Sequence, residues 1–386
     1  MAQLLIGSQD VTNRSLIKSV TVTNGRSSVT TQPQPANFSV ELSPDIDVYS
    51  YFGGVEIGDV IDWYLDDPYT GGMVRVFHGE ITDVNVRLDS WGLGQGIRTY
   101  AITALGLSAP LLRQNIDSAG FIKQYAGTRI YNCLVNEVSI DGGTYDVSGI
   151  ETPAVYEIAA INQGYVPALE LAQEAADSAM GVLFEDHIDG IMRYQSYTTR
   201  ATNPVITLTP NDVLASSLVV NKTTTEIANS VTVSYGASGT RGNTYTDPYS
   251  PAIYGQKDAV KDTTLHNATD ANTQAQIYLA ARKQPLYQLQ SISIDSAAVS
   301  ASLKHDLLNA KIGTIIDIPD SLIPEVGAFK GFIEQITWSS DRGHDTVTFV
   351  LSNYGQMYPF TMWSDVANTI TWQTWQTATT VWSDLI

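Results

Sequence analysis

The sequence predicts a mainly β fold, in which two small β-barrels flank a mixed α/β middle segment and a tryptophan-rich extension follows. Three observations lead to this prediction. Short runs of alternating apolar and polar residues recur along the chain, separated by Gly, Pro, Asn and Asp, as in all-β sandwiches and barrels. The alternation changes to helical periodicity near the centre of the chain. The last 29 residues hold four of the seven tryptophans.

Residues 1–110 are predicted to form the first barrel. Residues 17–24 alternate and end at a turn signal, Asn24-Gly25, and residues 38–42 alternate again. Residues 74–87 are typical of one or two strands, in which Gly79 indicates a bulge or bend. Together with residues 98–104, these runs indicate five or six strands within about 100 residues.

Residues 111–220 are predicted to form the mixed α/β middle domain. A helix is expected to begin near Thr128, and its apolar face includes Cys133. A second helix is expected over residues 166–180, with Pro167 at its start and a glycine directly after it. Residues 182–194 are typical of a hairpin that turns at an Asp-Gly pair, residues 189 and 190.

Residues 221–357 are predicted to form the second barrel. Residues 236–268 are rich in Gly, Thr, Asp, Asn and Tyr, and they indicate a long loop that is either functional or ordered by a partner. A helix is expected over residues 270–284, where Pro285 stops it. Strands are expected at residues 228–235, 287–295, 312–318, 330–339 and 345–352.

Two sets of aromatic residues are predicted to lie at an interface with partner chains. The long loop is expected to become ordered in an assembly through Tyr245, Tyr249 and Tyr254. The C-terminal segment 358–386 contains Trp-Ser-Asp twice, at residues 363–365 and 382–384. Its tryptophans either cover the chain's own barrel or bind a partner, and we favour binding to a partner. They are Trp363, Trp372, Trp375 and Trp382.

The charge balance argues against nucleic-acid binding. The chain has 40 acidic and 21 basic residues and a net charge of −19, and its Lys and Arg residues form no cluster that would bind phosphates. No apolar run reaches the roughly 18 residues of a transmembrane helix. The N-terminal sequence lacks the basic and apolar regions of a signal peptide, so none is expected. A single cysteine excludes an intrachain disulfide.

No motif indicates catalysis or a cofactor. The five histidines are too far apart in sequence for a helical metal pair, and the nucleophile-elbow and phosphate-loop motifs are absent. Cys133 is interpreted as a buried structural thiol because it lies on an apolar helix face. The sequence therefore predicts a protein that is not an enzyme and that binds no cofactor.

Two groups of carboxylates leave alternatives open. Asp83 with Asp89, or Glu185 and Asp186 near His187, would suit glycoside hydrolysis if their separation allowed it, but such pairs also arise by chance among 40 acids. A loose acidic stretch lacks the glycine and terminal Glu of a calcium-binding loop. It is therefore interpreted as an acidic loop at the surface, and a loop that binds a cation is the alternative. It consists of Asp45, Asp47, Asp59, Asp62, Asp66 and Asp67.

Several segments, in order, resemble those of phage tail proteins. The run His78-Gly79-Glu80-Ile81-Thr82-Asp83 resembles a step of phage tail hub barrels. Residues 20–26, before a Gln-Pro-rich turn, are similar to the opening of actinobacteriophage minor tail proteins. Residues 227–236 resemble the strand that enters the second hub barrel, and residues 280–285 resemble the family's helix-then-strand step. Residues 312–318 resemble a further strand of the family, with Thr314 where an acidic residue is common.

The resemblance covers residues 15–355 and the tryptophan-rich tail, and it rests on order and spacing. It implies a siphophage minor tail protein or baseplate hub protein, a homotrimeric ring that joins the tail tube to distal host-recognition parts. Two hub-type barrels per chain would continue a hexameric tube with pseudo-six-fold symmetry, and an acidic lumen would let DNA pass without binding it.

The same resemblance implies partners and a location. The expected partners are the distal tail protein, the tape measure protein and further minor tail proteins, with no specific nucleic-acid binding. The expected location is the virion tail tip, after assembly from the host cytoplasm. A carbohydrate-binding adhesin, or a cell-wall or capsule hydrolase, is the alternative function.

Overall fold

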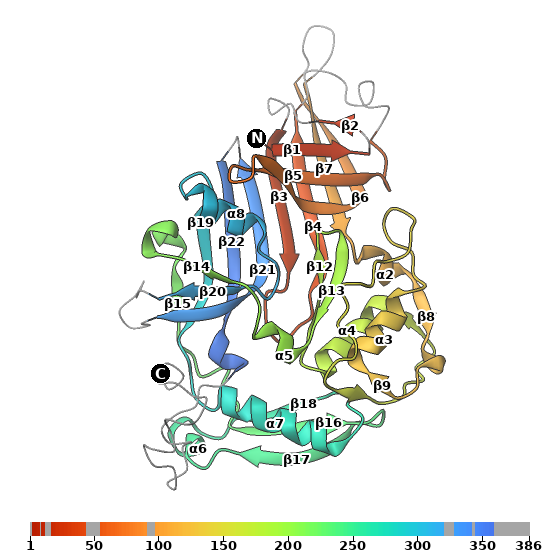
Figure 1. Ribbon diagram of the computed structural model, residues 1–386, viewed down its shortest axis with the longest axis vertical. Helices are drawn as coiled ribbons and strands as arrows, with labels where there is room; N and C mark the ends of the chain where they lie inside the picture. Colours follow the sequence, from red (N-terminus) through yellow and green to blue (C-terminus); the bar gives the residue numbers. More distant parts are fainter. Residues whose placement is uncertain are drawn as a thin grey trace.

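The computed structural model describes residues 2–7, 9–11, 17–43, 55–90, 97–319, 328–341 and 344–358. The chain is mainly β, as the sequence predicts, and a single large sheet forms its upper part in Figure 1. A helical middle segment and a small three-stranded sheet lie below and beside it. None of the helices within these ranges is long and apolar enough to cross a bilayer.

The large sheet unites strands from the first and last thirds of the chain. Its thirteen described strands are antiparallel except for one parallel pair, β14 with β20. The path from end to end is β15 (Val219–Asn221), β19 (Gln288–Asp295), β22 (His344–Asn353), β21 (Phe329–Asp341), β3 (Ile17–Gly25), β4 (Gln34–Leu42), β7 (Ile97–Gly106), β6 (Gly72–Ser90), β5 (Val60–Asp67), β1 (Ala2–Ile6) and β2 (Gln9–Asp10). Beside this path, β20 (Ile315–Ile318) pairs with β21 and with β14 (Val205–Thr207).

The pairing of β3 with β21 joins the two regions that the sequence assigns to separate barrels. In this pair Val22 lies opposite Trp338, and both side chains are buried. Both regions contribute to one hydrophobic core, which contains Phe38 and Phe77, stacked at 4.8 Å, as well as Phe349. The described strand path ends at β15 and β2, and closure of each half into a barrel stays a prediction.

The middle segment contains the helices that the sequence predicts. The helix expected near Thr128 is α3 (Ala126–Leu134), and the helix expected over 166–180 is α4 (Ala168–Ser178), with Pro167 as its N-cap. The hairpin is confirmed as β12 (Val182–Asp186) and β13 (Ile191–Gln195), with Gly190 at φ +75° in its turn. The smaller elements here are α2 (Ala109–Arg113), β8 (Asn115–Asp117), η1 (Ser118–Gly120), β9 (Gln124–Tyr125), β10 (Glu157–Ile158), β11 (Tyr165–Pro167) and α5 (Tyr197–Arg200).

The expectation of a long loop at 236–268 is wrong. This segment forms β17 (Thr240–Thr246), α6 (Ser250–Tyr254) and β18 (Asp258–Lys261). Both strands flank β16 (Ser230–Tyr235), β17 antiparallel and β18 parallel to it. The hydroxyl side chains of this segment form hydrogen bonds to the neighbouring strand, as Thr244 does with Thr232 of β16 at 2.7 Å, so its order does not depend on apolar periodicity.

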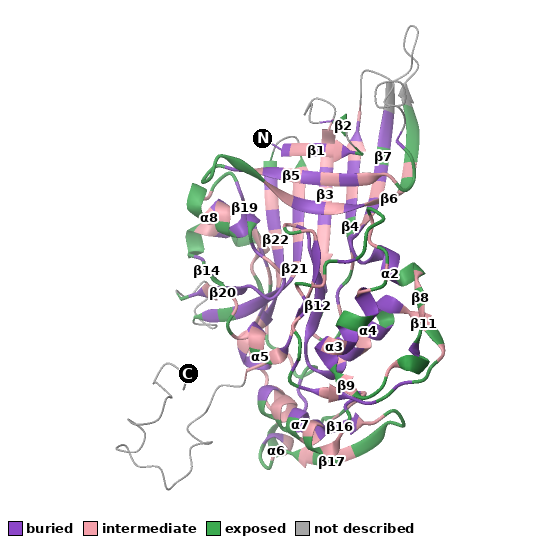
Figure 2. Cartoon of the chain, turned by 45° about the vertical axis from the view of Figure 1, so that its right-hand side comes forward, coloured by how far each residue is buried: buried purple, intermediate pink, exposed green. Residues whose placement is uncertain are grey.

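The three-stranded sheet belongs with the middle segment rather than with the large sheet. Helix α7 (Ala268–Arg282), expected over 270–284, packs on β16 and ends before Pro285. Val231 and Val233 of β16 share a second core with Ala172 and Ala176 of α4. Figure 2 shows this buried interior between α3, α4 and the three-stranded sheet.

The remaining predicted strands are confirmed. Residues 287–295, 330–339 and 345–352 correspond to β19, β21 and β22, and the run 312–318 contains β20. The run 74–87 is part of one long strand, β6, in which Gly79 pairs in register with Ile61 and Gly106; the bulge in its ladder with β7 lies at Ile81/Asp83 and not at Gly79. The other elements are η2 (Pro210–Asp212), η3 (Ala215–Ser217), α8 (Ala301–Leu308) and η4 (Tyr354–Gln356).

Candidate functional site

Of the three tyrosines predicted to lie at an interface, Tyr249 at the start of α6 faces solvent, and the exposed Ile253 of α6 lies beside it. Tyr249 is 75% exposed and Ile253 is 70% exposed, and their spacing of four residues places them on one side of a helical turn. Tyr254 is half-buried, and Tyr245 packs against the second core. We call Tyr249 and Ile253 the α6 surface.

Buried polar residues fix the backbone that carries this surface. The fully buried Asn229 donates hydrogen bonds from Nδ2 to Ser250 Oγ at 3.2 Å and to the Gly255 carbonyl at 2.8 Å. Asp247 Oδ1 accepts the N–H groups of Tyr249 and Ser250 at 3.0 and 2.7 Å. Burial raises the pKa of Asp247, but these hydrogen bonds and the nearby Lys283 ammonium together outweigh burial and lower it below its usual range. The α6 surface is therefore held rigidly.

The predicted tryptophans lie outside the described residues, and the chain that leads to them is anchored. They are Trp363, Trp372, Trp375 and Trp382. Tyr197 donates from its hydroxyl to the Met357 carbonyl at 2.7 Å, and Tyr358 donates to the Tyr197 carbonyl. The rings of Tyr197 and Tyr358 stack at 4.6 Å. The C-terminal segment therefore starts from a fixed point beside α5.

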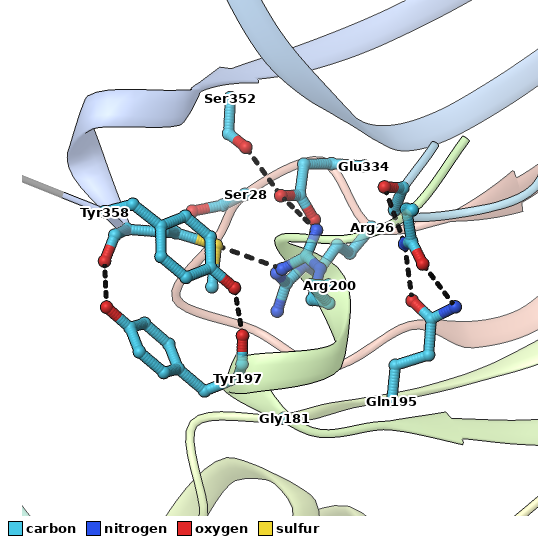
Figure 3. A network of polar contacts seen from close by, with 12 residues as sticks. Arg26, Ser28, Gly181, Gln195, Tyr197, Arg200, Glu334, Ser352 and Tyr358 are labelled. Atoms are coloured by element: carbon cyan, nitrogen blue, oxygen red, sulfur yellow. Dashed lines mark hydrogen bonds and ion pairs between the residues drawn. The ribbon is translucent and has the colours of Figure 1, made fainter. Parts of the chain in front are cut away.

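A buried ion cluster joins this point to the large sheet (Figure 3). Glu334 of β21 accepts from Arg26 Nε at 2.7 Å, from Arg200 Nη2 at 2.9 Å and from Ser352 Oγ at 2.6 Å. Arg200 also lies 4.8 Å from the centre of the Phe332 ring. Burial raises the pKa of Glu334, yet the two guanidinium groups outweigh it and lower that pKa to about 2. The cluster fixes α5 against the sheet.

Glu185 forms a second buried junction, between β12 and the large sheet. Its carboxylate accepts from the N–H of Ser108 at 2.7 Å and of Ala36 at 3.1 Å, and His187 Nε2 lies 3.0 Å away. Burial raises the pKa of Glu185, but the adjacent His187 and the hydrogen bonds from Ser108 together outweigh burial and lower this pKa. Asp186 in turn binds Arg193 and Lys311.

In the structure, the carboxylates considered as candidates for glycoside hydrolysis contact other residues of the chain. Glu185 and Asp186 are both buried, and every contact named above is with the protein itself. Asp83 is exposed and accepts from Asn85 at 2.7 Å, and the side chain of Asp89 lies outside the described residues.

The acidic stretch does not converge on one point where the structure describes it. Asp62 accepts from His78 Nδ1 at 2.7 Å, and Asp67 lies 2.7 Å from His305 Nδ1. Asp59 accepts from a neighbouring backbone N–H at 2.9 Å. Within the described ranges, no three His, Cys, Asp or Glu side chains come close enough to hold a metal ion. Asp45 and Asp47 lie outside those ranges.

Cys133 is fully buried in the second core. Burial raises the pKa of its thiol to about 12, far from the range in which a thiolate forms at neutral pH. This agrees with its interpretation as a structural thiol.

Solved structures of phage tail proteins have this fold. The 43 kDa tail protein of prophage MuSo2 from Shewanella oneidensis is 16% identical, with a TM-score of 0.60 over 92% of this chain and 99% of that one. A tail protein from Neisseria meningitidis is 12% identical, with a TM-score of 0.56 over 91% and 96%. Prophage tail protein gp18 from Listeria monocytogenes is 9% identical, with a TM-score of 0.55 over 92% and 95%. No protein-family model and no curated protein sequence matches the chain.

Proposed function

We propose that this chain is a structural component of a phage-type tail, with no catalytic role. The observation that carries the proposal is the end-to-end correspondence of its fold with a 43 kDa tail protein, over 92% of one chain and 99% of the other. The buried Glu185 and Glu334 junctions support the same role, because they stiffen the contacts between the parts of the chain.

In the finer form of the proposal, the chain is a minor tail or baseplate hub protein. Three copies form a ring that joins the tail tube to distal host-recognition parts. Each chain supplies two hub-type barrels, residues 1–110 and 221–357, around the middle domain 111–220. The net charge of −19 supports a lumen that repels the phosphates of passing DNA.

The partners in this proposal are other copies of the chain and neighbouring tail proteins. The distal tail protein and the tape measure protein are the expected neighbours, and the tail tip of the virion is the expected location. The α6 surface supports this proposal, because two large apolar side chains stand exposed on a rigid turn, as at the centre of many interfaces.

The symmetry of the purified full chain tests the ring. We expect mass photometry to show a trimer of the 42.0 kDa chain and electron microscopy to show three-fold rings. The double variant Tyr249→Ser/Ile253→Ser should lose assembly and keep its melting temperature. Tyr165→Ser, at a tyrosine that is 76% exposed elsewhere, is the matched control and should assemble normally. A monomer at all concentrations that binds glycans would contradict the ring and favour the adhesin.

The tryptophan-rich segment is proposed as a second assembly element. Because Tyr358 stacks on Tyr197, the deletion that tests it should begin after Tyr358. The truncated chain should keep its unfolding temperature and fail to join its partners, since interface tryptophans each contribute on the order of 2 kcal/mol or more. A marked fall in the unfolding temperature would instead assign the segment to the chain's own core.

A further inference from the structure

A pocket of about 380 Å³ lies between β13, β14 and the end of α8. The share of one water molecule in the liquid is about 30 Å³, so the pocket is large enough for a long side chain or a small molecule. Its lining includes Arg193, Val205, Ile206, Asp306, Asn309 and Lys311.

The two basic side chains in the lining are already neutralised. Lys311 Nζ lies 2.7 Å from Asp186 Oδ2 and 2.8 Å from Asp189 Oδ2. The guanidinium of Arg193 pairs with the same two carboxylates. Two acids and two bases therefore form one ion-pair network without net charge, which offers little attraction to an anion.

The end of α8 adds negative charge to the pocket. Asp306 and Asn309 both line the pocket and are exposed, and their spacing of three residues places them on one side of the helix end. Asp306 forms no hydrogen bond or ion pair with the part of the chain that the structure describes. Asn309 donates from Nδ2 to the His305 carbonyl at 2.8 Å, which leaves its Oδ1 as an acceptor. The negative end of the helix dipole lies at the same place.

The basic residues of α8 do not compensate Asp306. Lys304 lies 3.7 Å from Asp66, and His305 Nδ1 lies 2.7 Å from Asp67, both in β5. Neither of them is among the described lining residues. The pocket and its ion-pair network therefore carry one negative charge in excess, and the pocket is complementary to an ammonium or guanidinium group.

One edge of β14, beside the pocket, is unpaired within the described residues. The Leu208 N–H donates to the Asp317 carbonyl of β20 at 2.9 Å, so the even-numbered residues of this stretch direct their backbone groups to β20. Val205 and Thr207 direct their N–H and C=O groups to the opposite side, where the described chain supplies no strand. Such an edge accepts a strand from another chain.

We propose that an extended basic segment of a partner protein adds as a strand to the free edge of β14 and places one Arg or Lys side chain in the pocket, beside Asp306. The net charge of −19 attracts a basic segment over a longer range. The partner is a different protein rather than a second copy, because the Lys and Arg residues of this chain form no cluster. The inference does not depend on the ring of the proposed function, because one chain supplies both the pocket and the edge.

Nuclear magnetic resonance of the full-length chain with a synthetic peptide tests the inference. The probe is acetyl-Thr-Val-Arg-Val-Thr-amide, which favours extended backbone and carries one guanidinium. We expect it to shift the backbone amide signals of Val205 and Thr207, and we expect Asp306→Asn to weaken its binding about tenfold, the factor for one charge-assisted hydrogen bond. Asp83→Asn, at an exposed aspartate of β6, is the matched control and should leave the binding unchanged. The peptide with Gln in place of Arg should bind weakly to the natural chain and to Asp306→Asn alike.

Methylation of the peptide backbone separates strand addition from attraction by charge. In an added strand only every second residue directs its N–H to β14. N-methylation of the two valines and N-methylation of the two threonines should therefore differ in effect, so that one modified peptide loses binding and the other keeps it.

Three results would overturn the inference. The first is unchanged amide signals of Val205 and Thr207 at peptide concentrations up to about 5 mM. The second is an equal effect of the two methylation patterns, which would exclude an added strand. The third is tighter binding of the peptide with Glu in place of Arg, which would assign the pocket to an anion held by Arg193 and Lys311.

Discussion

Replacing Glu334 with glutamine should destabilise the chain strongly at neutral pH. The carboxylate is buried between Arg26 and Arg200, and its pKa falls from 4.5 to about 2 in the folded chain. Each unit of pKa shift corresponds to 1.36 kcal/mol, so the ionised carboxylate contributes about 3 kcal/mol to the free energy of unfolding. Removing it leaves two buried guanidinium groups uncompensated, for which losses of about 3 to 5 kcal/mol are typical.

The effect should depend on pH in one direction. Because the folded state lowers the pKa of Glu334, its contribution is complete above about pH 4.5, the ordinary pKa, and is lost as the pH falls towards 2. The difference in unfolding free energy between the natural chain and Glu334→Gln should therefore shrink over that interval and stay constant from pH 5 to pH 7.

Urea unfolding followed by circular dichroism at pH 7, 5 and 3.5 measures this difference. Glu80→Gln is the control, because Glu80 pairs with Arg113 at the surface, where an ion pair contributes at most about 1 kcal/mol. A loss below about 1 kcal/mol for Glu334→Gln, or a difference that does not change with pH, would refute the electrostatic account of this cluster.

Three further predictions concern single residues. Cys133 should resist thiol reagents in the native chain at pH 8 and react fully in urea, because burial raises its pKa to about 12; rapid native labelling would contradict this. Gly25→Ala should lower the free energy of unfolding in urea by about 2 kcal/mol or more, since the residue has φ +111° and an added Cβ would lie 2.2 Å from the Glu334 carbonyl; a loss below about 0.5 kcal/mol would contradict it. Asn229→Ala should raise hydrogen exchange in α6 about tenfold or more, because it removes the buried contacts to Ser250 and Gly255, and unchanged exchange would show that those contacts do not hold the turn.

Local sequence patterns predicted the elements that form through interactions between residues close together in the sequence. The hairpin turns at Asp189-Gly190 because Gly190 adopts a positive φ, and α7 ends where Pro285 would block it. The mainly β class follows from the same kind of evidence, since alternation with a period of two is a property of each strand.

Long-range pairing could not be read from those patterns. The joining of β3 to β21 depends on residues that are more than 300 positions apart, and each strand alone is compatible with a separate barrel. Strands β17 and β18 escaped prediction because their residues are mostly polar and form hydrogen bonds within the sheet, as Thr244 of β17 does with Thr232 of β16.

The ion cluster and Ile253, the second residue of the α6 surface, were missed for different reasons. Glu334 follows Phe332 and Ile333 in a buried strand, and this isolated charge was an available signal of a buried partner. No sequence pattern identifies Arg26 and Arg200 as the residues that pair with Glu334. Ile253 is one apolar residue in a polar segment, and only the fold shows that it stands exposed beside Tyr249.

The pairing of β3 with β21 also affects synthesis of the chain on the ribosome. Thr23 and Thr337 lie opposite each other in the sheet but are 314 residues apart in sequence. Translation adds roughly 5 to 20 residues per second, so the edge of β3 that pairs with β21 stays unpaired for about 16 to 60 s after its own synthesis, until β21 emerges. During that time neighbouring nascent chains on one messenger expose the same unpaired edge to one another. The cell that makes the chain therefore has to keep the β3 edges of neighbouring nascent chains from pairing with one another until β21 has emerged.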